Sequence, residues 1–368
     1  MLDELYYRLA LNFTPHLSNF NIKKLIQYYE SAAEVFNPNN KKPHISNKVT
    51  FKHPFPKIDN SIDGLVRKEL EIIQKKSIQV CFFDQPEYPT RLRSCSNAPN
   101  IFYYKGDGVF NHSKMLSIIG TRNASSYGAD VVHKIISEIA SDDIVIVSGL
   151  ASGIDTLAHE AALHYGLKTI GVMGSGFSRV YPDSNIKLVK KMIESGSTVM
   201  TEYNYEVKPD RVNFPIRNRI IASISDATLV VESKNRGGSI ITAEMAHTFN
   251  RDVFAIPGSI FDENQEGCHE LIAQKKASII TSGEEMLKKM GWNSTQPQWV
   301  QPKLFYDFSE DEEFVYKLLK SIPQMTIDEL VALCPLFTPS KIASILLGLE
   351  FNGIIECKPG KVYRLIRK

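Results

Sequence analysis

The stretch Ile-Val-Ile-Val-Ser-Gly-Leu-Ala-Ser-Gly-Ile-Asp, residues 144–155, decides the fold. Its first part, Ile144–Val147, is a continuous β-branched run without polar alternation, which is typical of a strand buried on both faces. A turn of small residues follows, and a helix-length segment begins at Ile154. Strand, tight turn and helix form the repeating unit of a parallel sheet that is covered by helices.

The same unit recurs along the middle of the chain and predicts an α/β fold for residues 76–290. We expect an extended Rossmann-like, doubly wound parallel sheet with helices on both faces. The expected strands are Ile78–Phe83, Ile101–Tyr104, Met115–Ile119, Ile144–Val147, Thr169–Met173, Thr198–Met200, Thr228–Val231, Val253–Ile256 and Ser278–Ile280.

The flanking regions predict two further domains. Residues 1–75 repeat apolar residues at helical spacing and predict an N-terminal helical domain, and the Pro-containing residues 291–308 predict a linker. Residues 309–368 predict three helices and a hairpin, the order of a C-terminal winged-helix domain. Its second helix begins with the capping box Thr326-x-x-Glu329. The third expected helix carries one cation, Lys341, so we expect this domain to bind a protein partner or itself before DNA.

Composition sets limits on the class of protein. The 368 residues carry 43 Lys+Arg against 41 Asp+Glu, and 43% hydrophobic residues exclude wholesale disorder. Five scattered cysteines without a CxxC pair favour reduced thiols. We expect no secretory signal and no membrane span, because no apolar run approaches the roughly 18–20 residues that cross a bilayer. A cytoplasmic protein is the resulting expectation.

Four expected loops with small residues follow strands and predict a phosphate-binding edge. Parallel strands place their carboxyl ends together, and glycine lets the backbone approach an anion at a helix start. The alternative is that tight turns simply favour Gly and Ser. The dinucleotide and Walker patterns are both missing, so we expect no cofactor. The loops are Gly120-Thr121-Arg122, Ser148–Asp155, Gly174-Ser175-Gly176 and Glu232–Ser239.

A basic stretch adds a second signal. Lys208 and Arg211 precede Phe214-Pro215, after which Arg217 and Arg219 project from the first turns of a helix. Phosphate donors beside aromatic faces are what a single-stranded nucleic acid requires, because its bases stack while its backbone is neutralised. The alternative is a solvated helix end with core aromatics. The nearby aromatic residues are Phe177, Tyr181, Tyr203, Tyr205 and Phe214.

Catalytic signals are weak. His159 and His164 are poorly spaced for a shared metal, so we expect no metal. Asp155 stands where a carboxylate orients the backbone amides of a helix start, and Ser148 lacks a nucleophile elbow. Glu202 and Glu232 follow strands, as carboxylates of nucleotide hydrolases do, so a hydrolase remains an alternative.

Taken together, the ordered motifs closely resemble the bacterial DNA-processing protein DprA (Smf) family over residues 76–290. The order of helical (SAM-like), Rossmann-like and winged-helix domains fits its longer members. The motifs are Ile118-Ile119-Gly120-Thr121-Arg122, Ser148-Gly149-x-Ala151-x-Gly153-Ile154-Asp155, Gly174-x-Gly176, Phe214-Pro215-x-Arg217-Asn218-Arg219 and Gly238-Ser239-x-Ile241-Thr242-Ala243.

The resemblance implies a non-enzymatic role in natural transformation and homologous recombination. Family members bind and protect incoming single-stranded DNA, help to load the recombinase RecA, and act as homodimers through the Rossmann-like domain. Arg122 is then the best phosphate contact. The full set of expected DNA-binding residues is Gly120, Thr121, Arg122, Ser148, Gly149, Gly153, Gly174, Gly176, Lys187, Arg217, Asn218 and Arg219.

Two other interpretations stay open. Rossmann-like nucleotide hydrolases of the lysine-decarboxylase-like group use Gly-Gly-x-x-Thr loops, which Gly237–Thr242 loosely matches, with Glu232 or Glu244 as the nearby carboxylates. A pure protein-interaction scaffold is the third.

Overall fold

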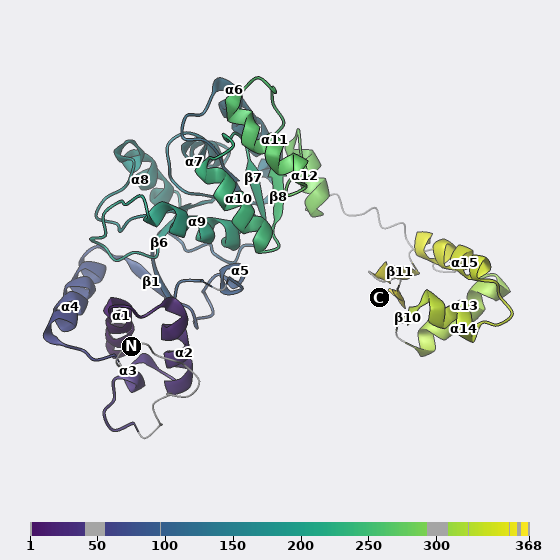
Figure 1. Cartoon of the computed structure of the whole chain (residues 1–368), viewed down its shortest axis with the longest axis horizontal. Coiled ribbons are helices and arrows are strands. Elements are labelled where there is room, and N and C mark those ends of the chain that lie inside the picture. Colours follow the sequence, from purple (N-terminus) through teal and green to yellow (C-terminus); the bar gives the residue numbers. More distant parts are fainter. Residues whose placement is uncertain are drawn as a thin grey trace. The chain divides into compact units, whose positions relative to one another are not determined.

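The chain forms two compact units, residues 1–293 and 294–368 (Figure 1). The structure, a computed structural model, describes residues 2–40, 56–95, 97–292, 308–322, 324–352, 354–358 and 362–366. The predicted linker at 291–308 lies almost wholly outside these residues, and the four-part domain division stays a prediction.

A nine-stranded sheet forms the centre of the first unit, in the order β1-β2-β6-β5-β4-β3-β7-β8-β9. The seven strands β3–β9 are parallel, and β3–β7 are buried along their whole length, which confirms the predicted fold. The strands are β1 Gln79–Phe82, β2 Ile101–Lys105, β3 Met115–Ile119, β4 Val145–Ser148, β5 Thr169–Val172, β6 Thr198–Thr201, β7 Ala227–Val230, β8 Asp252–Ala255 and β9 Ser278–Ile279.

The first two strands differ from the expected parallel sheet. β1 pairs with β2, and β2 pairs with β6, both in antiparallel register. The connection between β1 and β2 contains only the four-residue helix α5, Thr90–Arg93, in place of the longer crossover helix that usually joins parallel strands. The hairpin therefore closes one edge of an otherwise parallel sheet.

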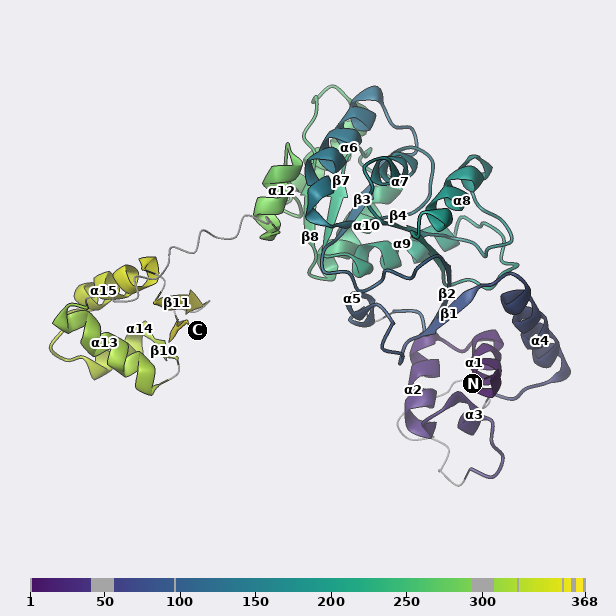
Figure 2. The same cartoon turned by 180° about the vertical axis from the view of Figure 1, so that it is seen from behind.

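Helices cover both faces of the sheet (Figures 1 and 2). Residues from α5, α9, α10 and α11 share one apolar core with the strands. Residues from α6, α7 and α12 share the core on the other face. The bounds are α5 Thr90–Arg93, α6 Ser126–Ile139, α7 Ile154–His164, α8 Ile186–Glu194, α9 Asn213–Ile224, α10 Gly238–Thr248, α11 Glu266–Ala273 and α12 Gly283–Met290.

Of the four N-terminal helices, α1 and α4 pack against the β1–β2 hairpin within the same unit, and α2 and α3 share a second core with α1. Leu9 and Val66 share a core with Ile101 and Tyr103 of β2. Arg8 reinforces this packing through two hydrogen bonds to the Asp84 carboxylate, 2.7 and 2.6 Å long. The helices are α1 Leu2–Phe13, α2 Asn19–Tyr29, α3 Ala32–Val35 and α4 Asn60–Lys75.

The second unit contains three helices and a three-stranded antiparallel sheet in the order β10-β12-β11. The predicted capping box at Thr326 and Glu329 is present. The element order agrees with a winged helix, whose assignment stays a prediction, and the expected Pro359-Gly360 turn lies outside the described residues. The elements are α13 Glu310–Ser321, β10 Met325–Thr326, α14 Ile327–Leu333, α15 Pro339–Phe351, β11 Ile355–Lys358 and β12 Val362–Leu365.

Across the described residues, no helix combines the length and the apolar character needed to cross a membrane.

A buried histidine links α7 to the sheet. The Thr169 hydroxyl donates to the Ile146 carbonyl, so His159 Nδ1 donates to Thr169 Oγ1 over 2.7 Å. His159 Nε2 has no partner among the described residues, and the ring is fully buried. Burial lowers the pKa of His159 from 6.5 to about 3, with a smaller contribution from the Arg217 charge.

This histidine should make the stability of the first unit depend on pH. Between pH 6.5 and about 3 the His159 imidazole is protonated in the unfolded chain and neutral in the folded chain. The free energy of unfolding should therefore fall as the pH falls through this range. The slope contributed by His159 approaches about 1.4 kcal/mol per pH unit. Urea unfolding at several pH values should show a shallower slope for His159→Gln, whereas the exposed-site control His164→Gln should keep the wild-type slope. An unchanged slope in His159→Gln would contradict the assignment.

Candidate nucleic-acid interface

A cavity of about 780 Å³ opens at the carboxyl edge of the parallel strands, beside the first turns of α9 and α10. These two helices lie side by side (Figure 1). Five cations and one carboxylate line the cavity, so its local charge is strongly positive although the chain is nearly neutral. The charged lining residues are Arg122, Arg211, Arg217, Lys234, Arg236 and Asp155.

The loop after β4 builds the floor of the cavity. Gly153 has φ of +77°, and a Cβ there would collide with the backbone of Thr121 and Arg122. A Cβ on Gly149 would lie 2.6 Å from Asp155 Oδ2 and 2.9 Å from Arg217 Cζ. Glycine at both positions therefore lets the loop after β3, the loop after β4 and α9 converge.

Asp155 organises this floor. Its Oδ2 accepts hydrogen bonds from the backbone N–H groups of Gly149 and Ala151, at 3.2 and 3.3 Å. These amides belong to the loop before α7, so the carboxylate orients that loop and not the helix start that the sequence predicted. Burial raises the pKa of Asp155, while the Arg217 charge and these hydrogen bonds oppose the shift.

Arg217 lies almost fully buried at the back of the cavity. Its Nη1 donates to the carbonyls of Gly149 and Val172. Burial lowers the pKa of Arg217 to about 10, and the Asp155 charge opposes that shift. The guanidinium therefore stays protonated at neutral pH and positions the loops after β4 and β5 as well as facing the cavity.

The mouth of the cavity combines cations with an aromatic pair. Arg122 is exposed, and its Cζ lies 5.3 Å from the centroid of the Phe214 ring, with Arg217 Cζ at 5.9 Å from the same ring. The Tyr181 and Phe214 ring centroids are 5.6 Å apart. Cationic groups thus gather around aromatic surface that a planar base can contact.

The structure brings many of the predicted residues together. Gly120, Thr121, Arg122, Arg217 and Asn218 line the cavity. Gly149 and Gly153 shape the floor, and the Ser148 hydroxyl donates to the Ile118 carbonyl beneath it, 2.7 Å away.

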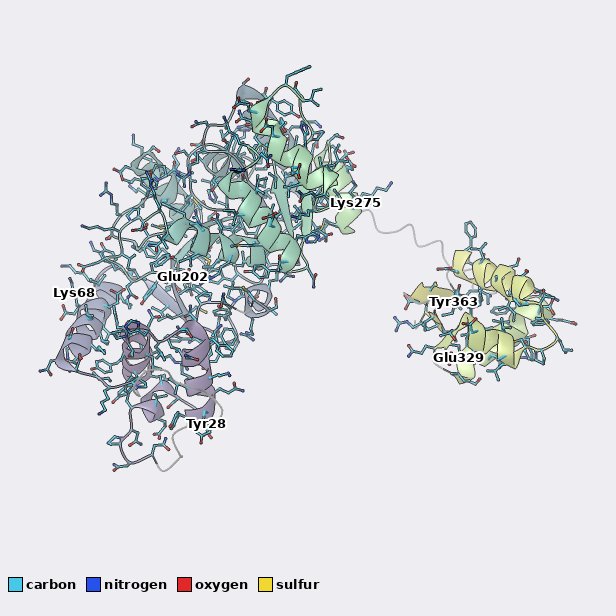
Figure 3. The ribbon with its side chains drawn as sticks, in the orientation of Figure 1. Tyr28, Lys68, Glu202, Lys275, Glu329 and Tyr363 are labelled. Atoms are coloured by element: carbon cyan, nitrogen blue, oxygen red, sulfur yellow. The ribbon has the colours of Figure 1, made fainter. Side chains whose placement is uncertain are left out.

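Four of the predicted residues lie apart from the cavity lining. A Cβ on Gly174 would lie 2.8 Å from Phe214 Cδ1, so the absence of a side chain at this glycine leaves room for the Phe214 ring. Gly176 packs against the backbone of residues 204–205. Lys187 is exposed on α8. Arg219 turns inward and pairs with Glu202, which follows β6 and is labelled in Figure 3. Arg217 and Arg219 are two positions apart on α9, so their side chains point about 200° apart around the helix axis, and only Arg217 faces the cavity.

The predicted set left out several lining residues: Arg211, Phe214, Lys234 and Arg236, with Ser233 and Ser239. The signal for them was present in the sequence. Lys234 and Arg236 follow β7, whose neighbour is β3, so their loop meets the Gly120-Thr121-Arg122 loop at one edge.

The carboxylates that a nucleotide hydrolase would need have structural partners. Glu232 accepts from the backbone N–H of Ser125 at 3.0 Å and from its hydroxyl, which holds the start of α6. Glu244 pairs with Lys276 at 2.8 Å, and neither carboxylate lines the cavity. Within the described residues no cluster of His, Cys, Asp and Glu is suited to hold a metal ion.

Sequence comparisons show which known proteins this chain resembles. A sequence model described as DNA recombination-mediator protein A matches residues 79–291. The DNA processing protein DprA of Streptococcus pneumoniae is 44% identical over 200 residues, which are 54% of this chain and 70% of the relative. Protein Smf of Escherichia coli is 33% identical over 310 residues, which are 80% of this chain and 82% of the relative.

Solved structures agree with these sequence matches. The X-ray structure of DprA from Streptococcus pneumoniae superposes with a TM-score of 0.63 at 32% identity, covering 78% of this chain and 98% of that one. DprA from Helicobacter pylori, described in a single-stranded DNA binding mode, gives a TM-score of 0.52 at 25% identity, covering 58% of this chain and 95% of that one.

The floor of the cavity should tolerate no side chain at Gly153. We expect Gly153→Ala to lower the free energy of unfolding by about 1–3 kcal/mol, because an L-residue is strained there and its Cβ meets backbone. Gly238→Ala is the matched control, since a Cβ there has open space, and it should change stability by at most about 0.5 kcal/mol. Denaturant melts of both variants test this, and equal stabilities would refute it.

Proposed function

The chain belongs to the DNA recombination-mediator protein A family, and from this premise we propose that its α/β unit binds single-stranded DNA in the cavity beside α9 and α10. The observation that carries the proposal is the placement of the Arg122 and Arg217 guanidiniums around the Phe214 ring. Cations neutralise backbone phosphates while an exposed aromatic face stacks with an unpaired base, and a base-paired duplex does not offer such a face.

The proposed contacts follow from the lining. Arg122, Arg211, Lys234 and Arg236 hold phosphates, and the free N–H groups at the start of α10 add donors. Asn218, Gly120 and Thr121 complete the wall. The loops around the cavity are positioned by six of the remaining predicted residues: Ser148, Gly149, Gly153, Gly174, Gly176 and Arg217. Arg219 anchors α9 through Glu202, and Lys187 provides a positive charge outside the cavity.

In the cell we propose the family role that the sequence implies. The protein would protect incoming single strands in natural transformation, load the recombinase RecA onto them, remain cytoplasmic and have no catalytic activity of its own. A homodimer would form through the α/β unit. The outer strand β9 supports that surface, because both its residues are exposed and its outer edge has no neighbouring strand in the sheet.

A nucleotide hydrolase is the second candidate function. Glu232 and Glu244 are engaged elsewhere, as described above, which argues against it. Release of free base from a nucleoside monophosphate, followed by chromatography, separates the two functions.

Arg122→Ala should weaken binding of a single-stranded oligonucleotide by at least about tenfold, the loss of one charge-assisted hydrogen bond. The slope of log affinity against log salt should fall by about one. Lys168→Ala is the control, because this exposed lysine precedes β5 and lies at the opposite sheet edge. Fluorescence anisotropy over a salt series measures both. Equal affinity of wild type and Arg122→Ala would reject the site.

RecA loading and dimer formation need their own test. We expect the protein to stimulate strand exchange by RecA and to sediment as a dimer. Ile279→Asp should shift the sedimentation coefficient towards a monomer, because a charge on an edge strand opposes pairing with another edge. No stimulation of strand exchange would remove the RecA role, and a wild-type monomer would remove the dimer.

A further inference from the structure

A second cavity, of about 480 Å³, lies between the N-terminal helices and the segment that follows β1. The end of β1 pairs with the start of β2, and β2 runs antiparallel to β6, so this end of the hairpin lies at the carboxyl edge of the parallel strands. Both cavities therefore open at the same edge of one sheet. The lining residues are Arg8, Lys23, Ile26, Gln27, Glu30, Phe83, Asp84, Arg93 and Asn100.

The cations of this cavity differ in how they are neutralised. Arg8 is paired with Glu4 at 2.7 Å and with Asp84 at 2.6 Å. Lys23 and Arg93, by contrast, have no carboxylate within 4 Å among the described residues. Neither charge has an ion-pair partner among the described residues, although the carboxylates of Glu30 and Asp84 also line the cavity.

These two cations converge on one aromatic ring. Lys23 Nζ lies 3.8 Å from the centroid of Phe83, and Arg93 Cζ lies 5.8 Å from the same centroid. Each makes one hydrogen bond to a backbone carbonyl, Lys23 to Ala98 at 2.6 Å and Arg93 to Gln85 at 2.7 Å. An ammonium has three donors and a guanidinium five, so most of their donors remain available to a ligand.

Helix α9 lines the first cavity and packs against α5, which carries Arg93 of the second. Arg217 lines the first cavity, while the charge of Arg219, on the opposite side of the helix, reaches Lys23. Burial lowers the pKa of Lys23 to about 8, and the Arg219 charge adds to this shift. Arg219 itself is paired with Glu202, so the unpaired charges here are those of Lys23 and Arg93, and a bound anion would neutralise them.

The separation suits a short piece of one strand. Five strand spacings of about 4.8 Å separate β3, whose following loop carries Arg122 of the first cavity, from β1, beside the second, which gives about 24 Å. At about 3.4 Å per nucleotide, a stacked strand covers that span with about seven nucleotides, and an extended strand needs fewer.

We propose that the cavity formed by Lys23, Phe83 and Arg93 is a second phosphate subsite, which holds the backbone of the single strand after it leaves the first cavity and passes α9. This inference rests on the proposed function of the first cavity. It makes the N-terminal helices part of the DNA-binding surface, and it makes affinity depend on strand length.

The test compares Lys23→Gln and Arg93→Gln with wild type on oligothymidylates of three and twelve nucleotides. Lys24→Gln is the matched control, because Lys24 is the adjacent residue of α2, contacts the Phe20 ring at 4.2 Å and does not line the cavity. Arg93 is exposed, so its variant keeps the test valid if Lys23→Gln folds poorly. We expect each subsite variant to lose about tenfold in affinity for the twelve-nucleotide strand, and little for the three-nucleotide strand.

The outcomes separate this subsite from the proposed function. If Arg122→Ala weakens both strands while Lys23→Gln and Arg93→Gln bind the long strand like wild type, the second subsite is refuted and the first cavity stands. If the subsite variants lose affinity for thymidine monophosphate or inorganic phosphate but not for the long strand, the cavity binds a free phosphate ligand, and the path across α9 is refuted. An equal loss of affinity for the twelve-nucleotide strand in Lys24→Gln would show that the effect comes from the net positive charge of α2 and not from the cavity, which also refutes the subsite.

Discussion

The buried guanidinium of Arg217 is the interaction on which the rest of the site depends. It links α9 to the carbonyls at Gly149 and Val172, and so fixes the loops after β4 and β5 against one helix. A buried charge is tolerated only when its donors are satisfied, so these loops have little freedom to move independently. Asp155 completes the arrangement from the other side of Gly149, where no side chain has room. The exposed Arg122 and the half-buried Phe214 lie beside this buried network.

A nearly neutral chain concentrates positive charge locally because its acidic residues have structural partners. Glu232 holds the start of α6, Glu202 pairs with Arg219, and Asp84 pairs with Arg8. At the sheet edge Arg122, Arg211 and Arg236 face solvent, while Lys234 pairs with Glu263 at 2.7 Å. Since parallel strands end at one edge, loops far apart in the chain contribute to one positive surface. Attraction for an anion then comes from the local field and not from the net charge of +2.

The C-terminal unit has a different surface character. Lys341 of α15 is paired with Asp311 at 2.6 Å, while Leu347 and Phe351, one helical turn apart, are 68% and 91% exposed. An exposed apolar pair on a helix favours contact with protein over contact with DNA. This character agrees with the interaction role predicted for the unit from the single cation of its third helix, and the role itself stays a prediction.

The sequence by itself determined the parallel core, the helices on both faces and the loops that meet at one edge, because β-branched runs and small-residue turns are local signals. It also singled out Arg122 and Asn218, which line the cavity and whose binding roles stay predictions. Only the tertiary structure decided that β1 and β2 are antiparallel, that Arg219 faces inward, and that Arg211, Lys234 and Arg236 share a cavity with Arg122. It likewise brought Lys23 of α2 to Phe83 and Arg93, sixty and seventy positions along the chain. The physical reason is that strand direction, the buried side of a helix and contacts between distant segments depend on which surfaces pack together, and a local pattern does not contain that information.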